Sequence, residues 1–245
     1  FIHLMITQEE FFQNLSDLNS RIEDACEKSG RPRSSLTLLP VTKNWPSEVV
    51  KYCKNAGLKT VGENRVQEAI EKMSDVPNFD FELIGHLQSN KVNMATGNFA
   101  RIQTVDSMKL LERIGAASEK KSKCQKILIQ VNAGDDPAKF GITVDEAELL
   151  VERALEINSI QLNGLMTIAP FIEGDTKVAS KCFAKLRVLK ERLELKTGAE
   201  LPELSMGMSG DIEAAILEGA TMLRVGTDIF GPRTDKEHNK ESSTL

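Results

Sequence analysis

The sequence lacks the patterns that mark several large classes of protein. Its 31 lysine and arginine residues are outnumbered by 36 acidic ones, and the net charge is −5. This balance gives no basic surface of the kind that binds nucleic acid. No apolar stretch approaches the roughly 18 residues that a membrane-spanning helix needs. We therefore expect a chain that binds neither nucleic acid nor membrane.

The sequence also has few cysteines, and no two of them lie close together in the chain. Four are scattered along the chain without any C-x-x-C pattern, at Cys26, Cys53, Cys124 and Cys182. That spacing indicates neither a zinc site nor a disulfide framework. We expect reduced thiols, no bound metal and a cytoplasmic location.

What the chain does have is ordinary globular composition, with 245 residues of which 40% are hydrophobic and 27% charged. A single α/β barrel commonly needs about 250 residues. We expect one domain over residues 5–233. Residues 1–4 precede Met5, the expected native start, and are interpreted as a cloning remnant. The polar tail at 234–245 is expected to be flexible.

Apolar and β-branched segments recur along the chain in a way that is typical of short buried strands. Eight of them are expected, at residues 36–42, 59–62, 81–85, 100–105, 126–131, 161–167, 203–207 and 222–225. An N-terminal helix begins at the capping pair Thr7 and Glu10 and ends at Gly30. Further helical patterns fill the gaps, at 49–57, 65–73, 89–96, 107–120, 143–157, 177–196 and 211–218.

Strands that alternate with helices pair in parallel through right-handed crossovers. Eight such units, several with apolar strands, favour a closed barrel over an open sheet. The predicted fold class is therefore α/β, a single (β/α)8 barrel of the TIM type with an additional N-terminal helix.

Lys43 stands where the first apolar strand stops, before the loop residues Asn44, Trp45 and Pro46. A partly desolvated lysine at the mouth of a barrel has a lowered pKa, and its free amine attacks carbonyl groups to form a Schiff base. The alternative is a lysine that simply extends its ammonium group to water at a strand end.

Small residues follow the last two predicted strands. Ser209 lies in the turn after strand seven, and Gly226 and Thr227 follow strand eight. Free backbone N–H groups and hydroxyls at this edge of a barrel are typical of phosphate sites. Alternatively, Ser209 caps the helix that begins at Asp211. Because strand eight pairs with strand one in a closed barrel, Lys43 is expected to face Arg224 and Gly226. A reactive amine beside an anion cradle suits pyridoxal phosphate.

Six ordered motifs resemble those of the pyridoxal phosphate homeostasis protein family, which is similar to the barrel domain of bacterial alanine racemase. They are LPVTK at 39–43, GENRVQE at 62–68, IGHLQSNK at 84–91, GLMTI at 164–168, LSMGMS at 204–209 and RVGTDIFG at 224–231. The resemblance covers residues 11–233. The chain departs from the family at Thr42, Asn44 and Trp45, near the rim of the expected pocket.

The resemblance implies that Lys43 carries pyridoxal 5′-phosphate as an internal aldimine. It places Ser209, Gly226 and Thr227 around the phosphate, Asn64 near the ring and Arg224 opposite the pyridine nitrogen. Met206 either lines the ring or packs the end of the barrel.

The function implied is that of a protein that holds the cofactor and takes part in vitamin B6 homeostasis, rather than an enzyme. Racemases of this fold use a tyrosine on the opposite ring face, whereas the one tyrosine here, Tyr52, lies in a helix outside the barrel. We expect no catalytic residues, a monomer, and apo forms of pyridoxal-phosphate enzymes as possible recipients. The alternatives are a racemase or lyase that uses His86 or Lys91, and an aldolase-like Schiff-base barrel.

Overall fold

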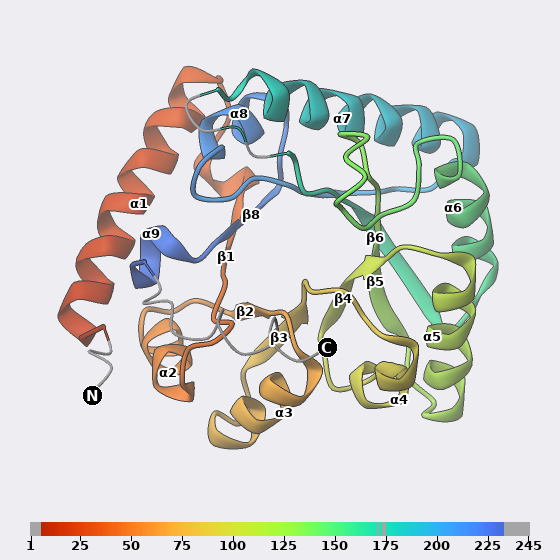
Figure 1. The fold of residues 1–245 in the computed structure, drawn as a ribbon, viewed down its shortest axis with the longest axis horizontal. Helices are drawn as coiled ribbons and strands as arrows, with labels where there is room; N and C mark the ends of the chain where they lie inside the picture. Colours follow the sequence, from red (N-terminus) through yellow and green to blue (C-terminus); the bar gives the residue numbers. More distant parts are fainter. Residues whose placement is uncertain (1–5, 171, 173–174, 233–245) are drawn as a thin grey trace, which may run out of the picture.

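The computed structural model describes residues 6–232 apart from 171, 173 and 174 (Figure 1). The expectations for residues 1–4 and 234–245 fall outside the described residues.

Eight parallel strands form one sheet in the order β1-β8-β7-β6-β5-β4-β3-β2. They are β1 (Thr37–Pro40), β2 (Thr60–Glu63), β3 (Asp80–Leu83), β4 (Arg101–Val105), β5 (Gln125–Gln130), β6 (Ile160–Met166), β7 (Glu203–Ser205) and β8 (Met222–Val225). A parallel bridge between Val41 and Gly62 joins the first strand to the second and closes the barrel. The predicted (β/α)8 barrel is confirmed.

Pro40 explains why the joint between β1 and β2 is so short. The amides of Thr37 and Val41 donate to Thr221 and Val225 on the β8 side, whereas Thr42 donates to Gly62. Alternate residues of β1 therefore face β8 and β2 in turn. Pro40 falls on the β2 side, and proline has no amide hydrogen to donate.

The helices surround this barrel and connect consecutive strands (Figure 1). Those of at least six residues are α1 (Gln8–Lys28), α2 (Ser47–Asn55), α3 (Val66–Asp75), α5 (Met108–Lys120), α6 (Ala147–Glu156), α7 (Lys177–Thr197) and α8 (Ile212–Leu217). The extra helix α1 begins with the predicted capping box, in which Thr7 and Glu10 bond to each other's backbone N–H groups. It packs against α8 and against the short helix α9 (Thr227–Phe230).

Short elements differ from the predictions in type more than in place. The helix expected at 89–96 consists of a 3₁₀ turn, η2 (Ser89–Lys91), followed by one α-helical turn, α4 (Val92–Ala95). Neither the 3₁₀ turn η1 (Arg33–Ser35) nor α9 was predicted. Helices this short carry too few residues for a helical period to show in the sequence.

The main hydrophobic core lies between the outer face of the barrel and the helices around it. A smaller apolar cluster of Leu39, Val41, Ile84 and Met222 is separate from it. The four cysteines are free, as predicted. Among the described helices, none combines the length and apolar character needed to cross a membrane.

Candidate cofactor site

Lys43 follows the bridge at Val41 and lies half-buried in a turn at the carboxyl end of β1. The end of β8 is its neighbour in the barrel. Val41 donates its amide to Val225 at 2.8 Å, and a Cβ atom built on Gly226 would lie 3.4 Å from the Val41 carbonyl oxygen. The structure thus brings the Lys43 segment beside the glycine that was expected to approach a phosphate.

A buried ion cluster holds the backbone on both sides of Lys43. Lys72 from α3 donates to the Thr42 carbonyl at 2.7 Å, to Glu63 at 2.6 Å and to Glu68 at 2.7 Å. Glu68 in turn accepts the Asn44 amide at 2.6 Å, and Asn44 has a positive φ of 62°. The residues that flank Lys43 are therefore fixed to α3.

Glu63 is the most deeply placed member of this cluster and is fully buried. Its Oε1 accepts from Lys72 and from the Thr42 hydroxyl, the latter at 2.6 Å, whereas its Oε2 has no hydrogen-bond partner. Burial raises the pKa of the Glu63 carboxyl, against the opposing effect of Lys72 and Thr42. Sequence analysis missed this cluster, because Lys72 lies within a helical pattern that reads as an exposed face.

The turns after β7 and β8 meet, as expected for a phosphate cradle. The Ser209 hydroxyl accepts a long hydrogen bond of 3.4 Å from the Asp228 amide, one residue beyond Thr227. Ser209 does not cap α8, whose N-cap is Asp211. Asp211 instead accepts the Met208 amide at 2.6 Å. The alternative role for Ser209 as a helix cap is therefore wrong.

Two glycines in these turns are present for different physical reasons. Gly207 has a φ of +96°, and a Cβ atom there would lie 2.5 Å from that of Ala215. The backbone and the packing thus require glycine at this position. Gly226 has a φ of −116°, and a Cβ atom there would come no closer than 3.4 Å to its nearest neighbour, the Val41 carbonyl oxygen. The fold does not require glycine at 226, which favours a role in ligand approach.

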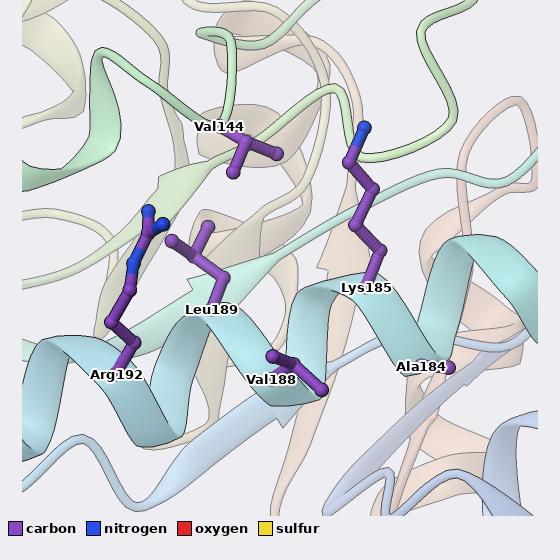
Figure 2. Close-up of a pocket in the computed structure, with 6 residues that line it drawn as sticks. All are labelled: Val144, Ala184, Lys185, Val188, Leu189 and Arg192. Atoms are coloured by element: carbon purple, nitrogen blue, oxygen red, sulfur yellow. The ribbon is translucent and has the colours of Figure 1, made fainter.

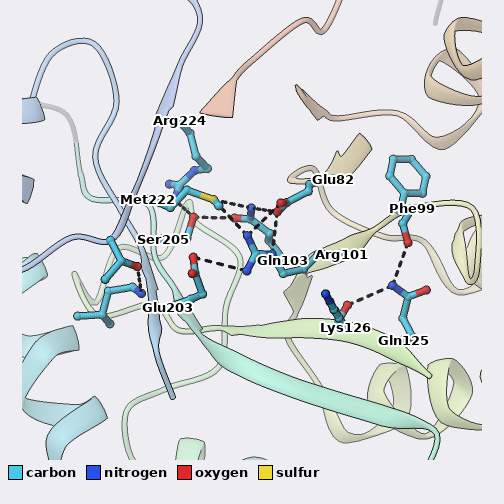
Figure 3. Close-up of polar contacts among 12 residues, drawn as sticks. Glu82, Phe99, Arg101, Gln103, Gln125, Lys126, Glu203, Ser205, Met222 and Arg224 are labelled. Carbon is cyan, nitrogen blue, oxygen red and sulfur yellow. Dashed lines mark hydrogen bonds and ion pairs between the residues drawn. The ribbon is translucent and has the colours of Figure 1, made fainter. Parts of the chain in front are cut away.

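Arg224 is buried inside the barrel, on β8. Its guanidinium donates to the Ser205 hydroxyl at 2.8 Å (Figure 3). It also donates to the Thr167 carbonyl at 2.7 Å. The Ser205 hydroxyl in turn donates a hydrogen bond of 2.6 Å to Gln103 Oε1. Burial lowers the pKa of Arg224 to about 10, so the guanidinium stays charged at neutral pH.

A polar chain continues from Gln103 through the barrel interior (Figure 3). Gln103 donates to Glu82 at 2.6 Å, and Arg101 holds both oxygens of Glu82 at 2.8 and 2.9 Å. Arg101 also lies 3.5 Å from Glu203, whose pKa is raised by burial. Arg224 is thus the upper end of a hydrogen-bonded chain that crosses the centre of the barrel and fixes its orientation.

Asn64 and Met206 occupy contrasting environments. Asn64 follows β2, and its backbone runs so close to Gly85 that a Cβ atom there would lie 2.2 Å from the Asn64 oxygen. Met206 is fully buried in the main hydrophobic core. Its position favours the packing role, and contact with a cofactor ring stays a prediction for both residues.

The side chains considered for racemase chemistry lie in three different places. Tyr52 lies in α2, outside the barrel, with its ring centroid 5.8 Å from that of Phe11. His86 lies 3.1 Å from Asp106 and stacks on the Phe140 ring at 4.1 Å. Lys91 ends η2, at the rim after β3. The expectation that Tyr52 packs on the outside is confirmed.

Trp45, the unusual residue beside the reactive loop, packs against the core rather than projecting freely. Its ring centroid lies 5.9 Å from that of Phe230 in α9.

A shallow groove elsewhere on the surface runs along α7, far in sequence from Lys43 and its neighbours. It is lined by Val144, Ala184, Lys185, Val188, Leu189 and Arg192 (Figure 2).

The donor set at the carboxyl ends of β1, β7 and β8 fits a phosphorylated aldehyde. Lys43 supplies an amine, and the Ser209 hydroxyl and the backbone N–H groups around Gly226 and Thr227 supply donors for an anion. Arg224 supplies a charged donor that is oriented from inside the barrel.

Comparisons with known proteins agree with this geometry. The family model for the alanine racemase N-terminal domain matches residues 14–234. The pyridoxal phosphate homeostasis protein of Aquifex aeolicus is 40% identical over 223 residues, which cover 90% of this chain and 97% of that protein.

Two solved structures are similar to the fold. PipY of Synechococcus elongatus, solved with pyridoxal phosphate bound, has a TM-score of 0.78 and 32% identity, covering 90% of this chain and all of that one. Alanine racemase of Clostridium difficile has the same TM-score at 14% identity and shows the fold alone. The match covers 93% of this chain and 58% of the racemase.

Proposed function

Because the chain belongs to the pyridoxal phosphate homeostasis protein family, we propose that it binds pyridoxal 5′-phosphate at Lys43 and takes part in controlling the supply of this cofactor. The observation that carries the proposal is the meeting of three strand ends. The half-buried Lys43 segment lies beside Gly226, and the Ser209 turn lies beside Asp228. PipY, which has the same barrel, was solved with pyridoxal phosphate bound.

The proposed attachment is a condensation. The Nζ atom of Lys43 adds to the aldehyde carbon, a C=N bond forms, and the aldehyde oxygen leaves as water, so the step is reversible by hydrolysis. The ion cluster around Lys72 keeps the flanking backbone of Lys43 in place while this happens. Ser209, Gly226 and Thr227 bind the phosphate, and Asn64 lies toward the ring, whereas Met206 packs in the hydrophobic core.

Arg224 gives the proposed site its character as a holder. Its guanidinium is charged at neutral pH and fixed by Ser205 and Thr167, and it would donate a hydrogen bond to the pyridine nitrogen of the bound cofactor. A nitrogen that accepts this bond stays unprotonated, and the ring is then a weak electron sink. Racemases share this arginine, and what separates this site from theirs is that its one tyrosine, Tyr52, lies outside the barrel.

We therefore propose binding without turnover, in the cytoplasm, with release of the aldehyde to apo enzymes that use it. The free state of all four cysteines supports a reducing compartment. A monomer and direct transfer to recipient enzymes remain predictions. The racemase or lyase alternative would rely on His86, whose Nδ1 lies 3.1 Å from Asp106 and whose ring stacks on Phe140.

The test is a titration of the purified protein with pyridoxal phosphate, followed by visible absorption and by borohydride reduction with peptide mapping. We expect an imine band, and a reduced adduct on the peptide that contains Lys43. Lys43→Ala should lose both, whereas the control Lys91→Ala should retain both. An unchanged band and adduct in Lys43→Ala would contradict the proposed attachment.

A further inference from the structure

The additional helix α1 sends one side chain into the turns that form the proposed phosphate cradle. Arg21 donates from Nε and Nη2 to the two oxygens of Glu213, at 2.6 and 2.7 Å. Its Nη1 donates to the Ser209 carbonyl at 3.0 Å and to Asp228 at 2.8 Å. One guanidinium thus joins α1 to the turn after β7, to α8 and to α9.

These contacts fix the two halves of the cradle relative to each other. The direct link between the halves is the Ser209–Asp228 hydrogen bond, which at 3.4 Å is long and weak. Arg21 binds the same two residues at other atoms, the backbone carbonyl of Ser209 and the side-chain carboxylate of Asp228. The Ser209 hydroxyl and the Asp228 N–H are therefore kept side by side, and because the bond between them is long, an anion that accepts from both can replace it.

Charge gives Arg21 a second role. Three carboxylates surround these turns, on Asp211, Glu213 and Asp228, and a phosphate placed among them meets repulsion. Arg21 bonds directly to two of the three. Its hydrogen bonds lower the pKa of Glu213, which keeps this carboxylate ionised, and the positive charge of Arg21 in the ion pair offsets its repulsion of a ligand. The side chain is 36% exposed, within reach of solvent but shielded on its inner side.

We propose that Arg21 is a positioning residue for the phosphate group of the ligand, acting through Ser209 and Asp228. This inference rests on the proposed function and deepens it, because it assigns the extra helix α1 a part in selecting a phosphorylated aldehyde. A purely structural role for Arg21, as an anchor of α1, makes a different prediction, since loss of an anchor affects phosphorylated and unphosphorylated ligands alike.

The experiment compares pyridoxal phosphate with pyridoxal, which has the same aldehyde and ring but no phosphate. Dissociation constants for both are measured from the imine band in wild type, Arg21→Met and Arg21→Lys, together with thermal unfolding of each variant. Asn14→Ala is the matched control, because Asn14 also ties α1 to α9 by a bond of 3.1 Å to the Ile229 carbonyl but does not contact the cradle.

We expect Arg21→Met to weaken the binding of pyridoxal phosphate by about tenfold or more, because the two turns are no longer held in place for the phosphate, with the binding of pyridoxal changed by less than about twofold. Arg21→Lys keeps the positive charge but not the planar guanidinium with its paired donors. It should show a smaller loss of affinity that again affects pyridoxal phosphate more than pyridoxal. If Arg21→Met does not fold, the lysine variant decides. Asn14→Ala should leave the ratio of the two constants unchanged.

Equal losses for the two ligands, or no loss in either Arg21 variant, would overturn the inference. That outcome is distinct from failure of the proposed function. In the latter case the wild type itself would form no imine at Lys43 with either ligand.

Discussion

Lys72 is buried next to the turn that carries Lys43, where an ammonium group is costly unless it is fully paired. Its three acceptors, the Thr42 carbonyl and the carboxylates of Glu63 and Glu68, meet that requirement. Removing one partner of a buried ion pair leaves the other charge uncompensated, which costs more than the pair contributes when intact.

Lys72→Met should therefore lower the free energy of unfolding by about 3–5 kcal/mol at pH 8. Burial already raises the pKa of Glu63, and losing Lys72 raises it further. The folded variant then takes up a proton that the unfolded chain does not hold at neutral pH, so its stability falls as pH rises above the ordinary glutamate range. Urea unfolding at pH 5 and pH 8 should show a smaller loss at pH 5.

The matched control is Lys51→Met, which breaks an exposed pair with Glu48 at 3.3 Å and should change stability by less than about 0.5 kcal/mol. Glu63→Gln combined with Lys72→Met should restore part of the loss, because no charge is then left buried. A loss in Lys72→Met that is independent of pH would show that the carboxylate is not the source of the cost.

At the scale of elements, the turns after β7 and β8 separate what the fold requires from what a ligand requires. Gly207→Ala forces a methyl group to within 2.5 Å of Ala215 at a positive φ, and should cost about 2 kcal/mol or more. Gly226→Ala meets no such contact and should keep stability within about 1 kcal/mol.

Gly226→Ala should nevertheless weaken the binding of pyridoxal phosphate by about tenfold, because the methyl group crowds backbone N–H groups that are proposed to bind the phosphate. Thermal unfolding and a ligand titration on the same preparations give both quantities. Full retention of affinity in Gly226→Ala would remove this turn from the proposed cradle.

The sequence predicts the element order well because the apolar runs and capping pairs are local signals. The capping box of Thr7 and Glu10 is an example, since both of its bonds form within one turn. The polar chain inside the barrel escaped prediction for a physical reason. Alternating segments such as Phe81-Glu82-Leu83 look like strands with one face in water, whereas closure of the barrel turns Glu82 inward.

The residues of the site also divide into those that the sequence predicts and those that it does not. Lys43, Ser209 and Arg224 are recognisable because they stand at strand ends within motifs that a family shares. Lys72 and Arg21 are not, because each lies on a helix among other charged residues, where sequence alone predicts contact with solvent. The partners of Arg21 lie far along the chain, and Glu213 is 192 positions away from it. Lys72 has Glu68 four positions away, but its bonds to Glu63 and to the Thr42 carbonyl depend on how α3 packs against β2 and the end of β1.

At the scale of the whole molecule, α1 connects the beginning of the chain to its end. Phe11 is fully buried and stacks on Phe230 of α9 at 5.9 Å, near Tyr52 of α2. Phe11→Ala should lower the free energy of unfolding by about 3–5 kcal/mol, the usual cost of removing a large core side chain.

Denaturant unfolding followed by two probes should still show one transition for Phe11→Ala, because α1 packs on elements that themselves complete the barrel. Phe12→Ala is the control. Its ring is 40% exposed, and the change should cost less than about 1 kcal/mol. A second transition in Phe11→Ala would indicate that α1 unfolds separately from the rest.

The proline in β1 has a consequence for how the ring of strands moves. Since Pro40 gives no amide to β2, the seam there depends on Val41, Thr42 and Gly62. We expect this joint to exchange its amide hydrogens with deuterated solvent sooner than the well-bonded β5–β6 joint. A hinge in the cylinder wall would then lie immediately before the lysine that is proposed to capture the vitamer.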